Sequence, residues 1–152
     1  MGLILKASEK RFEPIPEDTY PAVCVGLYDI GEQFNEKYDK AQKKVVITWE
    51  LIGATYQDEV GNERNKVVSK TFTASLHKQA KLRQILKSWR GKEFTPEELE
   101  GFDLKNILGA PCLVQIIHAE RDGLMYANVG SVTKLPKSFG AIEHQNEPIC
   151  FD

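Results

Sequence analysis

The sequence predicts a mainly β fold in which one helical insert interrupts a series of five strands. Residues 43–52 alternate apolar and polar side chains with the period of two that marks a strand with one buried face. Residues 76–90 carry apolar side chains at the i, i+3, i+4 and i+7 spacing of an amphipathic helix. Two apolar runs, 111–118 and 124–132, follow on either side of a short turn. The expected order of elements is therefore β-β-β-α-β-β.

The composition indicates one soluble domain. The chain has 152 residues, of which 41% are hydrophobic and 28% charged, so it is large enough to bury a core. No apolar stretch approaches the roughly 18 residues that span a bilayer, and residues 1–11 lack the apolar segment of a secretory signal. We therefore expect a cytoplasmic protein without membrane contact. We expect an N-terminal arm at residues 1–19, the domain at residues 20–136 and a flexible acidic C-terminal tail at residues 137–152.

The first three strands are recognised by their many β-branched and aromatic residues. They are expected at residues 20–30, 43–52 and 66–73. Gly26, inside the first strand, indicates a bulge or a sharp bend. The residues from Gly31 to Lys44 form a polar connection to the second strand, and the turn-forming pair Gly61 and Asn62 separates the second strand from the third. The second and third strands should therefore pair as a hairpin.

The helical insert carries clear boundary signals. Ser75 is a plausible N-cap for the helix at residues 76–90, and Gly91 follows its last turn. Residues 95–98, with the sequence TPEE, form the capping-box pattern that starts a second, shorter helix. The insert therefore holds one amphipathic helix that can cover a sheet and one short helix after it.

The order of elements points to a particular architecture. Asp122 and Gly123 form a hairpin turn signal between the last two strands. Five strands with a helix between the third and the fourth is the order of the OB-fold, a partly open barrel used largely for oligonucleotides and oligosaccharides. We therefore predict a five-stranded OB-fold barrel. An ordinary five-stranded sheet with one covering helix has the same order and remains the alternative.

We expect no enzymatic activity. The sequence has no G-x-S-x-G nucleophile turn, no Walker phosphate loop and no G-x-G-x-x-G fingerprint. His77, His118 and His144 are isolated from one another, and the three cysteines show neither disulfide-framework nor zinc-ligand spacing. No catalytic residue, cofactor or metal ligand is therefore predicted. A metal-dependent nuclease is the weakest alternative, because the acidic loop at residues 58–63 lacks a second acidic group to pair with.

Charge is distributed unevenly along the chain. The net charge is −2, but residues 36–92 hold 13 basic and 6 acidic residues, while the flanking segments hold 7 basic and 16 acidic ones. A basic middle segment can face nucleic acid although the whole chain is nearly neutral. An ordinary solvated surface of lysines is the alternative reading.

Aromatic and basic residues are interleaved in the segments that would form a nucleic-acid site. Single-strand binding requires cations for phosphates and flat side chains on which bases stack. In an OB-fold, the face of strands two and three and the loops between strands one and two and between strands four and five form the usual binding site. The candidate nucleic-acid-binding residues are Phe34, Lys37, Tyr38, Lys40, Lys43, Lys44, Lys66, Lys70, Phe72, Arg121 and Tyr126. Phe72 and Tyr126 can equally be core residues.

The C-terminal tail has its own pattern. From residue 141 onward it contains acidic residues and no Lys or Arg, with apolar side chains near its end. Such a segment can dock into the basic and apolar pocket of a partner protein. The candidate partner-binding residues are Ile149, Phe151 and Asp152. Disorder without a binding role is the alternative.

Five segments together resemble the single-stranded DNA-binding proteins, and OB-fold proteins of similar character, of bacteriophage and prophage replication or recombination modules. They are residues 21–26 (PAVCVG), 44–51 (KVVITWEL), 81–92 (KLRQILKSWRGK), 101–112 (GFDLKNILGAPC) and 126–129 (YANV). The resemblance implies largely sequence-independent binding of single-stranded DNA during phage or mobile-element DNA replication or recombination, in the cytoplasm of a bacterial host. It also implies a tail that recruits replication or recombination proteins. Homo-oligomer formation stays open.

A second function from a different class remains. The domain or its tail could recruit a replisome or host factor as a protein-interaction module that does not touch DNA. In that case the function would be insensitive to the lysines of the first connection.

Overall fold

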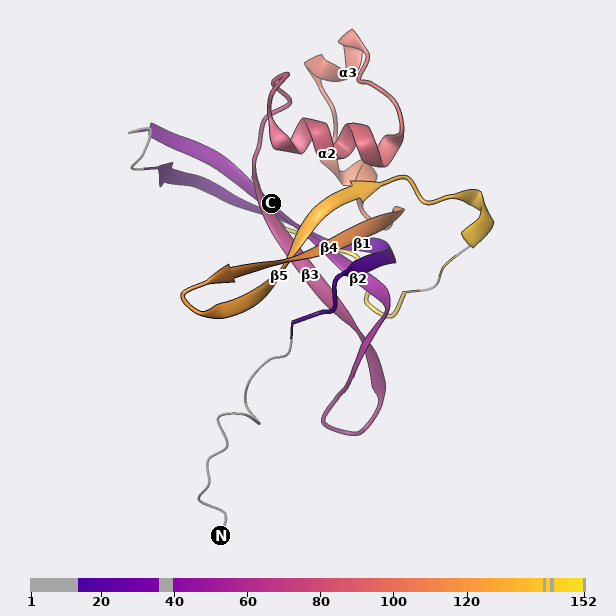
Figure 1. The fold of residues 1–152 in the computed structure, drawn as a ribbon. Coiled ribbons are helices and arrows are strands. Elements are labelled where there is room, and N and C mark those ends of the chain that lie inside the picture. The colour runs from indigo at the N-terminus through magenta and orange to yellow at the C-terminus, as the bar shows by residue number, and fades with distance from the viewer. Residues whose placement is uncertain (1–13, 36–39, 141, 143, 152) are drawn as a thin grey trace.

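One twisted β-sheet dominates the structure (Figure 1). This computed structural model describes residues 14–35, 40–140, 142 and 144–151. The strands are β1 (Asp18–Asn35), β2 (Lys40–Gln57), β3 (Glu63–Thr73), β4 (Pro111–Arg121), β5 (Leu124–Thr133) and β6 (Ile149–Phe151). The first five are antiparallel neighbours in the order β3-β2-β1-β4-β5, and β6 pairs in parallel with β1. The predicted mainly β class is confirmed, while β6 is a strand that the sequence pattern does not predict.

The backbone ladder of the described strands is open. β3 and β5 lie at its two ends and do not pair with each other. The two edge strands nevertheless come near each other. Lys70 Nζ on β3 donates a hydrogen bond to the carbonyl oxygen of Val129 on β5 over 3.4 Å. The sheet therefore curls toward itself without the continuous backbone hydrogen bonds of a closed barrel.

The hairpin formed by β1 and β2 is longer than predicted. The residues from Gly31 to Lys44, expected as a connection, pair instead as far as Asn35 and Lys40. The sequence pattern misses this extension because much of the ribbon is exposed, so its side chains show no alternation between apolar and polar. The bulge expected at Gly26 is confirmed by an irregularity in the register beside it.

The core lies between the sheet and the helix α2 (Lys81–Arg90). Trp49 in β2 is fully buried, and its ring centroid lies 6.0 Å from that of Trp89 on α2. Leu82 and Leu86 are the other buried residues of the helix. Trp89 Nε1 donates a hydrogen bond to the carbonyl oxygen of Pro111 over 2.9 Å, which fastens α2 to the start of β4.

The helix α2 begins at Lys81, later than the predicted residue 76. Ser75, the predicted cap, instead accepts a hydrogen bond from the backbone N–H of His77 over 3.0 Å, and the carbonyl oxygen of His77 accepts one from Ala80 N over 2.9 Å. These local bonds satisfy the backbone in a turn and so compete with the helix. Ala80 is consequently the N-cap residue, and it has no side-chain group that could cap the first turn.

The capping box of the second helix is confirmed. Thr95 Oγ1 accepts a hydrogen bond from Glu98 N, and Glu98 Oε1 accepts one from Thr95 N. Arg90 Nη2 forms an ion pair with Glu98 Oε2 over 2.6 Å, and the guanidinium carbon of Arg90 lies 4.4 Å from the ring centroid of Phe94. The short elements are α3 (Pro96–Glu100), η1 (Leu104–Ile107) and η2 (Lys137–Phe139). Of the helices that the structure describes, none has the length and apolar character to span a membrane.

Glu50 on β2 fastens the C-terminal segment to the sheet. Its side chain is 0% exposed. The carboxylate accepts hydrogen bonds from Gln145 N (2.7 Å), Asn146 N (2.9 Å), Asn146 Nδ2 (2.6 Å) and Asn65 Nδ2 (2.8 Å). Burial by itself raises the pKa of Glu50, but these hydrogen bonds outweigh burial and hold the pKa below its usual value. Glu50 is therefore charged in the folded protein at neutral pH.

Replacing Leu86, which is 0% exposed, by Ala should lower the free energy of unfolding by about 2–5 kcal/mol, because the substitution leaves a cavity beneath α2. Ser88→Ala, on the exposed side of the same helix, is the matched control and should change that free energy by less than about 0.5 kcal/mol. Urea titrations followed by circular dichroism measure both values. Equal losses in the two variants would contradict the placement of Leu86 in the core.

Replacing Glu50 by Gln should lower the free energy of unfolding at neutral pH by about 1–3 kcal/mol, because charge-assisted hydrogen bonds are lost. The pKa of Glu50 is lowered by folding, so its stabilisation is present at neutral pH and is lost as the pH falls below 4.5 and through the folded-state pKa.

Urea titrations between pH 7 and pH 3 should therefore show the difference between wild type and Glu50→Gln narrowing on acidification. Glu59→Gln, which changes an exposed carboxylate near the β2–β3 turn, should alter stability at pH 7 by less than about 0.5 kcal/mol. A constant difference across the pH range would show that the Glu50 charge does not supply the stabilisation.

Candidate nucleic-acid interface

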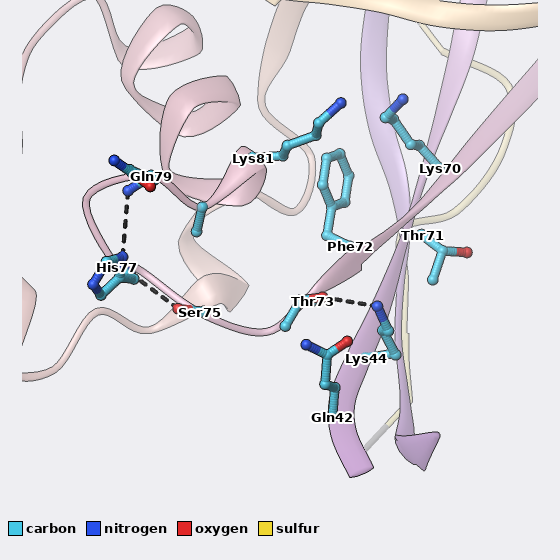
Figure 2. A pocket seen from close by; sticks show the side chains of 11 residues that line it. Gln42, Lys44, Lys70, Thr71, Phe72, Thr73, Ser75, His77, Gln79 and Lys81 are labelled. Atoms are coloured by element: carbon cyan, nitrogen blue, oxygen red, sulfur yellow. Dashed lines mark hydrogen bonds between the residues drawn. The ribbon is translucent and has the colours of Figure 1, made fainter. Parts of the chain in front are cut away.

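A basic pocket of about 540 Å³ lies where β2 and β3 meet the start of α2 (Figure 2). It is lined by Gln42, Lys44, Lys70, Thr71, Phe72, Thr73, Ser75, His77, Gln79, Ala80 and Lys81. Three of these residues are lysines, and none is acidic. We call this site the cationic pocket.

Three different elements position the lysines of the cationic pocket. Lys44 on β2 is the cross-strand neighbour of Thr73, and its Nζ donates a hydrogen bond to Thr73 Oγ1 over 2.7 Å. Lys70 on β3 reaches the Val129 carbonyl oxygen, as described above. Lys81 is the first residue of α2 and is exposed. The pocket therefore exists only because the sheet edge and the helix start come together.

Phe72 forms an apolar wall of the cationic pocket. Figure 2 shows its ring between the side chains of Lys70 and Lys81. The side chain is 3% exposed and belongs to the hydrophobic core. A ring this deeply buried presents almost no face to a base, so Phe72 is a core residue at the edge of the pocket rather than a stacking platform.

The N-terminus of α2 adds to the positive potential of the cationic pocket. The residues Gln79, Ala80 and Lys81 at this helix start line the pocket. The first turn contains no acidic residue and has no side-chain cap, so its backbone N–H groups stay available. The helix dipole places partial positive charge at this end, which favours an anion. The helix start and the three lysines thus both favour a negatively charged ligand, and phosphate is the anion that such an arrangement suits.

Two hairpins extend to the same side of the molecule (Figure 1). Phe34 on the β1–β2 hairpin is 63% exposed. Tyr126 on the β4–β5 hairpin is 44% exposed, and the guanidinium carbon of Arg121 lies 5.9 Å from its ring centroid. Both rings are therefore open to stacking, and Arg121 gives the second one a cation.

The predicted site residues are only partly brought together. Lys44, Lys70 and Phe72 line the cationic pocket, whereas Lys66 on β3 is half-buried outside it. Lys43 is exposed on β2 and forms an ion pair with Asp29 over 3.6 Å. Lys37 and Tyr38 lie outside the described residues, and for Lys40 only the backbone is described. Ile149 is 44% exposed in β6, while the side chain of Phe151 and all of Asp152 lie outside the described residues.

Sequence reasoning missed Lys81, His77 and Gln79. The predicted helix at residues 76–90 places all three inside or at the start of a continuous helix, away from the sheet edge. Only the local hydrogen bonds of Ser75 and His77, which delay the helix to Lys81, bring these side chains to the pocket. Once the start of the helix is placed at Lys81, the lysine at that position indicates a concentration of positive charge there.

Two buried cysteines, Cys24 and Cys112, are the thiols whose pKa values are raised in the described part of the chain. Burial raises the pKa of the Cys24 thiol to about 12 and also raises the pKa of the Cys112 thiol, so both stay protonated at neutral pH. No group of three or more His, Cys, Asp or Glu side chains within the described ranges is arranged to hold a metal ion. Neither a protein-family model nor a curated protein sequence matches the chain.

Proposed function

We propose that this protein binds single-stranded DNA with little sequence preference, during DNA replication or recombination of a phage or mobile element in a bacterial cytoplasm. The observation that carries the proposal is the cationic pocket, in which three lysines and an uncapped helix start converge without a lining acid. Phosphates of a DNA backbone match this charge, and the exposed rings of the two hairpins supply stacking platforms.

The proposal includes an OB-type architecture. β1 pairs with β2 on one side and with β4 on the other, and the helical insert lies between β3 and β4. The edge strands β3 and β5 approach through the contact of Lys70 with Val129, where the seam of a small barrel would lie. In this architecture the hairpins β1–β2 and β4–β5 flank the binding face, which agrees with their projecting to one side.

A single strand fits this surface better than a duplex does. Reading a duplex usually requires a helix or ribbon that enters a groove. Here α2 buries one side against the sheet through Leu82, Leu86 and Trp89, and its start faces the pocket. Exposed rings such as Phe34 and Tyr126 gain stacking energy only from bases that are not already paired and stacked in a duplex. We therefore expect the affinity order to be single-stranded DNA above duplex DNA.

Binding should weaken steeply with salt, because each neutralised phosphate releases counterions. Lys44→Gln and Lys81→Gln should each weaken the binding of DNA strands of different base sequence by the same factor. Each should also reduce the magnitude of the slope of log K against log salt concentration by roughly 0.7–1. Fluorescence anisotropy with labelled single strands, matched duplexes and RNA at several salt concentrations measures both effects.

Lys87→Gln is the matched control for the lysine variants. Lys87 lies on the same helix, but its Nζ pairs with Glu93 over 3.0 Å outside the pocket, so its replacement should leave the slope unchanged. A flat salt titration of the wild type would refute phosphate binding. If none of the nucleic acids binds, the alternative of a protein-interaction module stands in its place.

Replacing Phe34 or Tyr126 by Ala should weaken single-strand binding by about 1–3 kcal/mol for each stacked base that is lost. Phe139→Ala is the control, because Phe139 is also an exposed ring (47%) but lies on η2. The same anisotropy assay at fixed salt measures the change. Unaltered affinity in both hairpin variants would place the stacking on other side chains.

A further inference from the structure

We propose a second, base-binding subsite for the same DNA strand at the far end of the β2–β3 hairpin, formed by Tyr56, Arg64 and Val67. The inference rests on the proposed function and extends it, because it fixes where the strand runs and how long a strand is covered. A hollow of about 460 Å³ lies there. It is lined by Tyr56, Arg64, Asn65, Val67, Gln145 and Asn146.

The hollow presents flat and apolar groups to solvent. Tyr56 is 48% exposed and Val67 is 49% exposed. Tyr56 and Arg64 are direct cross-strand partners, so their side chains lie on the same face of the hairpin. Aromatic rings and guanidinium planes are the two kinds of side chain on which unpaired bases stack. The pair therefore offers what a nucleobase needs, in contrast to the phosphate-directed lysines of the cationic pocket.

A large bulge explains why these side chains are displayed instead of buried. The register runs from Glu50 opposite Val67 directly to Thr55 opposite Asn65, so the residues 51–54 stand against the single residue 66. Gly53 adopts a φ of 103°, which favours glycine. Beyond this bulge the hairpin continues as a twisted ribbon outside the rest of the sheet (Figure 1). Tyr56 lies on that ribbon and thus escapes the core.

The wall of the hollow is held in place by hydrogen bonds. Glu50, fully buried, fixes the backbone N–H groups of Gln145 and Asn146, as described above. Gln145 Oε1 also accepts a hydrogen bond from Asn65 N over 2.9 Å. A wall that is already ordered loses little conformational entropy when a ligand binds, which favours affinity.

Arg64 is also oriented before any ligand arrives. Its Nε donates a hydrogen bond to Asp58 Oδ2 over 3.2 Å. The other carboxylate oxygen of Asp58 accepts hydrogen bonds from Val60 N (3.0 Å) and Asn62 N (2.9 Å), so the β2–β3 turn fixes the position of this carboxylate. The guanidinium is therefore anchored beside Tyr56 while about half of its side chain (48%) stays exposed.

A continuous strip of β3 joins the hollow to the cationic pocket. Thr71 lines the pocket and Val67 lines the hollow. Between them lies Ser69, whose hydroxyl is hydrogen-bonded to Thr48 Oγ1 over 2.7 Å, so only short side chains occupy this part of the face. The strip from Thr71 to Val67 is about 14 Å long at the strand rise of roughly 3.4 Å per residue.

The cationic pocket, the strip of β3 and the hollow together predict the length of DNA that the protein covers. From Thr73 to Arg64 the strand β3 extends about 30 Å at the same rise. This distance corresponds to about nine nucleotides at the 3.4 Å spacing of a stacked strand. It falls within the roughly 4–16 nucleotides that single domains of the OB type occupy. A stacked strand of four nucleotides has three steps of about 3.4 Å and spans about 10 Å, which is shorter than the strip of about 14 Å between the cationic pocket and the hollow. Such a strand can therefore reach only one of the two subsites, and its charge draws it to the lysines.

The test compares oligo(dT) of four and twelve nucleotides on the full chain by fluorescence anisotropy. Tyr56→Ala should weaken binding of the twelve-nucleotide strand about 10- to 100-fold and leave binding of the four-nucleotide strand unchanged. Tyr56→Phe keeps the ring and should retain the wild-type affinity for both. Gln57→Ala is the matched control, because Gln57 is the exposed neighbour whose side chain alternates to the opposite face, and it should behave as wild type.

A second readout is independent of affinity. In Tyr56→Trp, the new indole fluorescence should be quenched by the twelve-nucleotide strand and not by the four-nucleotide strand. If neither strand binds the wild type, the proposed function fails, and this inference fails with it. If both strands bind and Tyr56→Ala keeps the wild-type affinity for the longer one, only the second subsite is overturned. An equal loss for both lengths likewise overturns the subsite as a separate one.

Discussion

The change of partner along β1 is the constraint on which the rest of the structure depends. β1 pairs with β2 from Ala22 to Asn35, but its other side pairs with β4 only from Asp18 to Val23 and then with β6 from Gly26 to Tyr28. The bulge beside Gly26 marks the change. A Cβ at this position would lie 2.7 Å from a ring carbon of Tyr28 and 3.0 Å from the Cβ of Thr48, so a larger residue would displace the Tyr28 ring. Because β4 leaves β1 here, the sheet bends and its two edge strands come near each other.

The cationic pocket and the hollow at Tyr56 follow from that bend and from interruptions of regular structure. The cationic pocket exists because a turn around His77 delays the helix α2 until Lys81, so an uncapped helix start faces the sheet edge. The hollow at Tyr56 exists because a four-residue bulge carries the end of the β2–β3 hairpin away from the core. In both places, departures from an ideal helix or ladder leave charged or flat side chains accessible. The regular parts of the same elements bury theirs, as Trp49 and Leu86 show.

The sequence alone predicts the features that depend on neighbouring residues in the chain, such as the buried face of a strand or the cap of a helix. The buried face of β2 around Trp49 and the capping box at Thr95 follow from short-range patterns, and the structure confirms them. The late start of α2 depends on hydrogen bonds of Ser75 that compete with an equally plausible cap, so propensity alone misplaces it. β6 is short, and its segment is held by Glu50, a residue almost a hundred positions away in the chain. No local pattern carries that information. The place of Lys81 in the cationic pocket and that of Tyr56 in the hollow likewise depend on where α2 starts and where β2 bulges, which residue propensities do not predict.

A side-chain contact between Lys70 and Val129 joins β3 and β5, where a backbone ladder would join the edge strands of a closed barrel. Backbone pairing would fix two strands at roughly 4.8 Å, whereas an ammonium group on a four-carbon stem can keep its carbonyl partner over a range of separations as its rotamers change. The ammonium has three donors, so Lys70 can hold the carbonyl oxygen of Val129 and a phosphate oxygen at the same time. If the proposed DNA binding holds, Lys70 would contact the strand while it still bridges β3 and β5, and binding would then be coupled to the separation of these two edge strands.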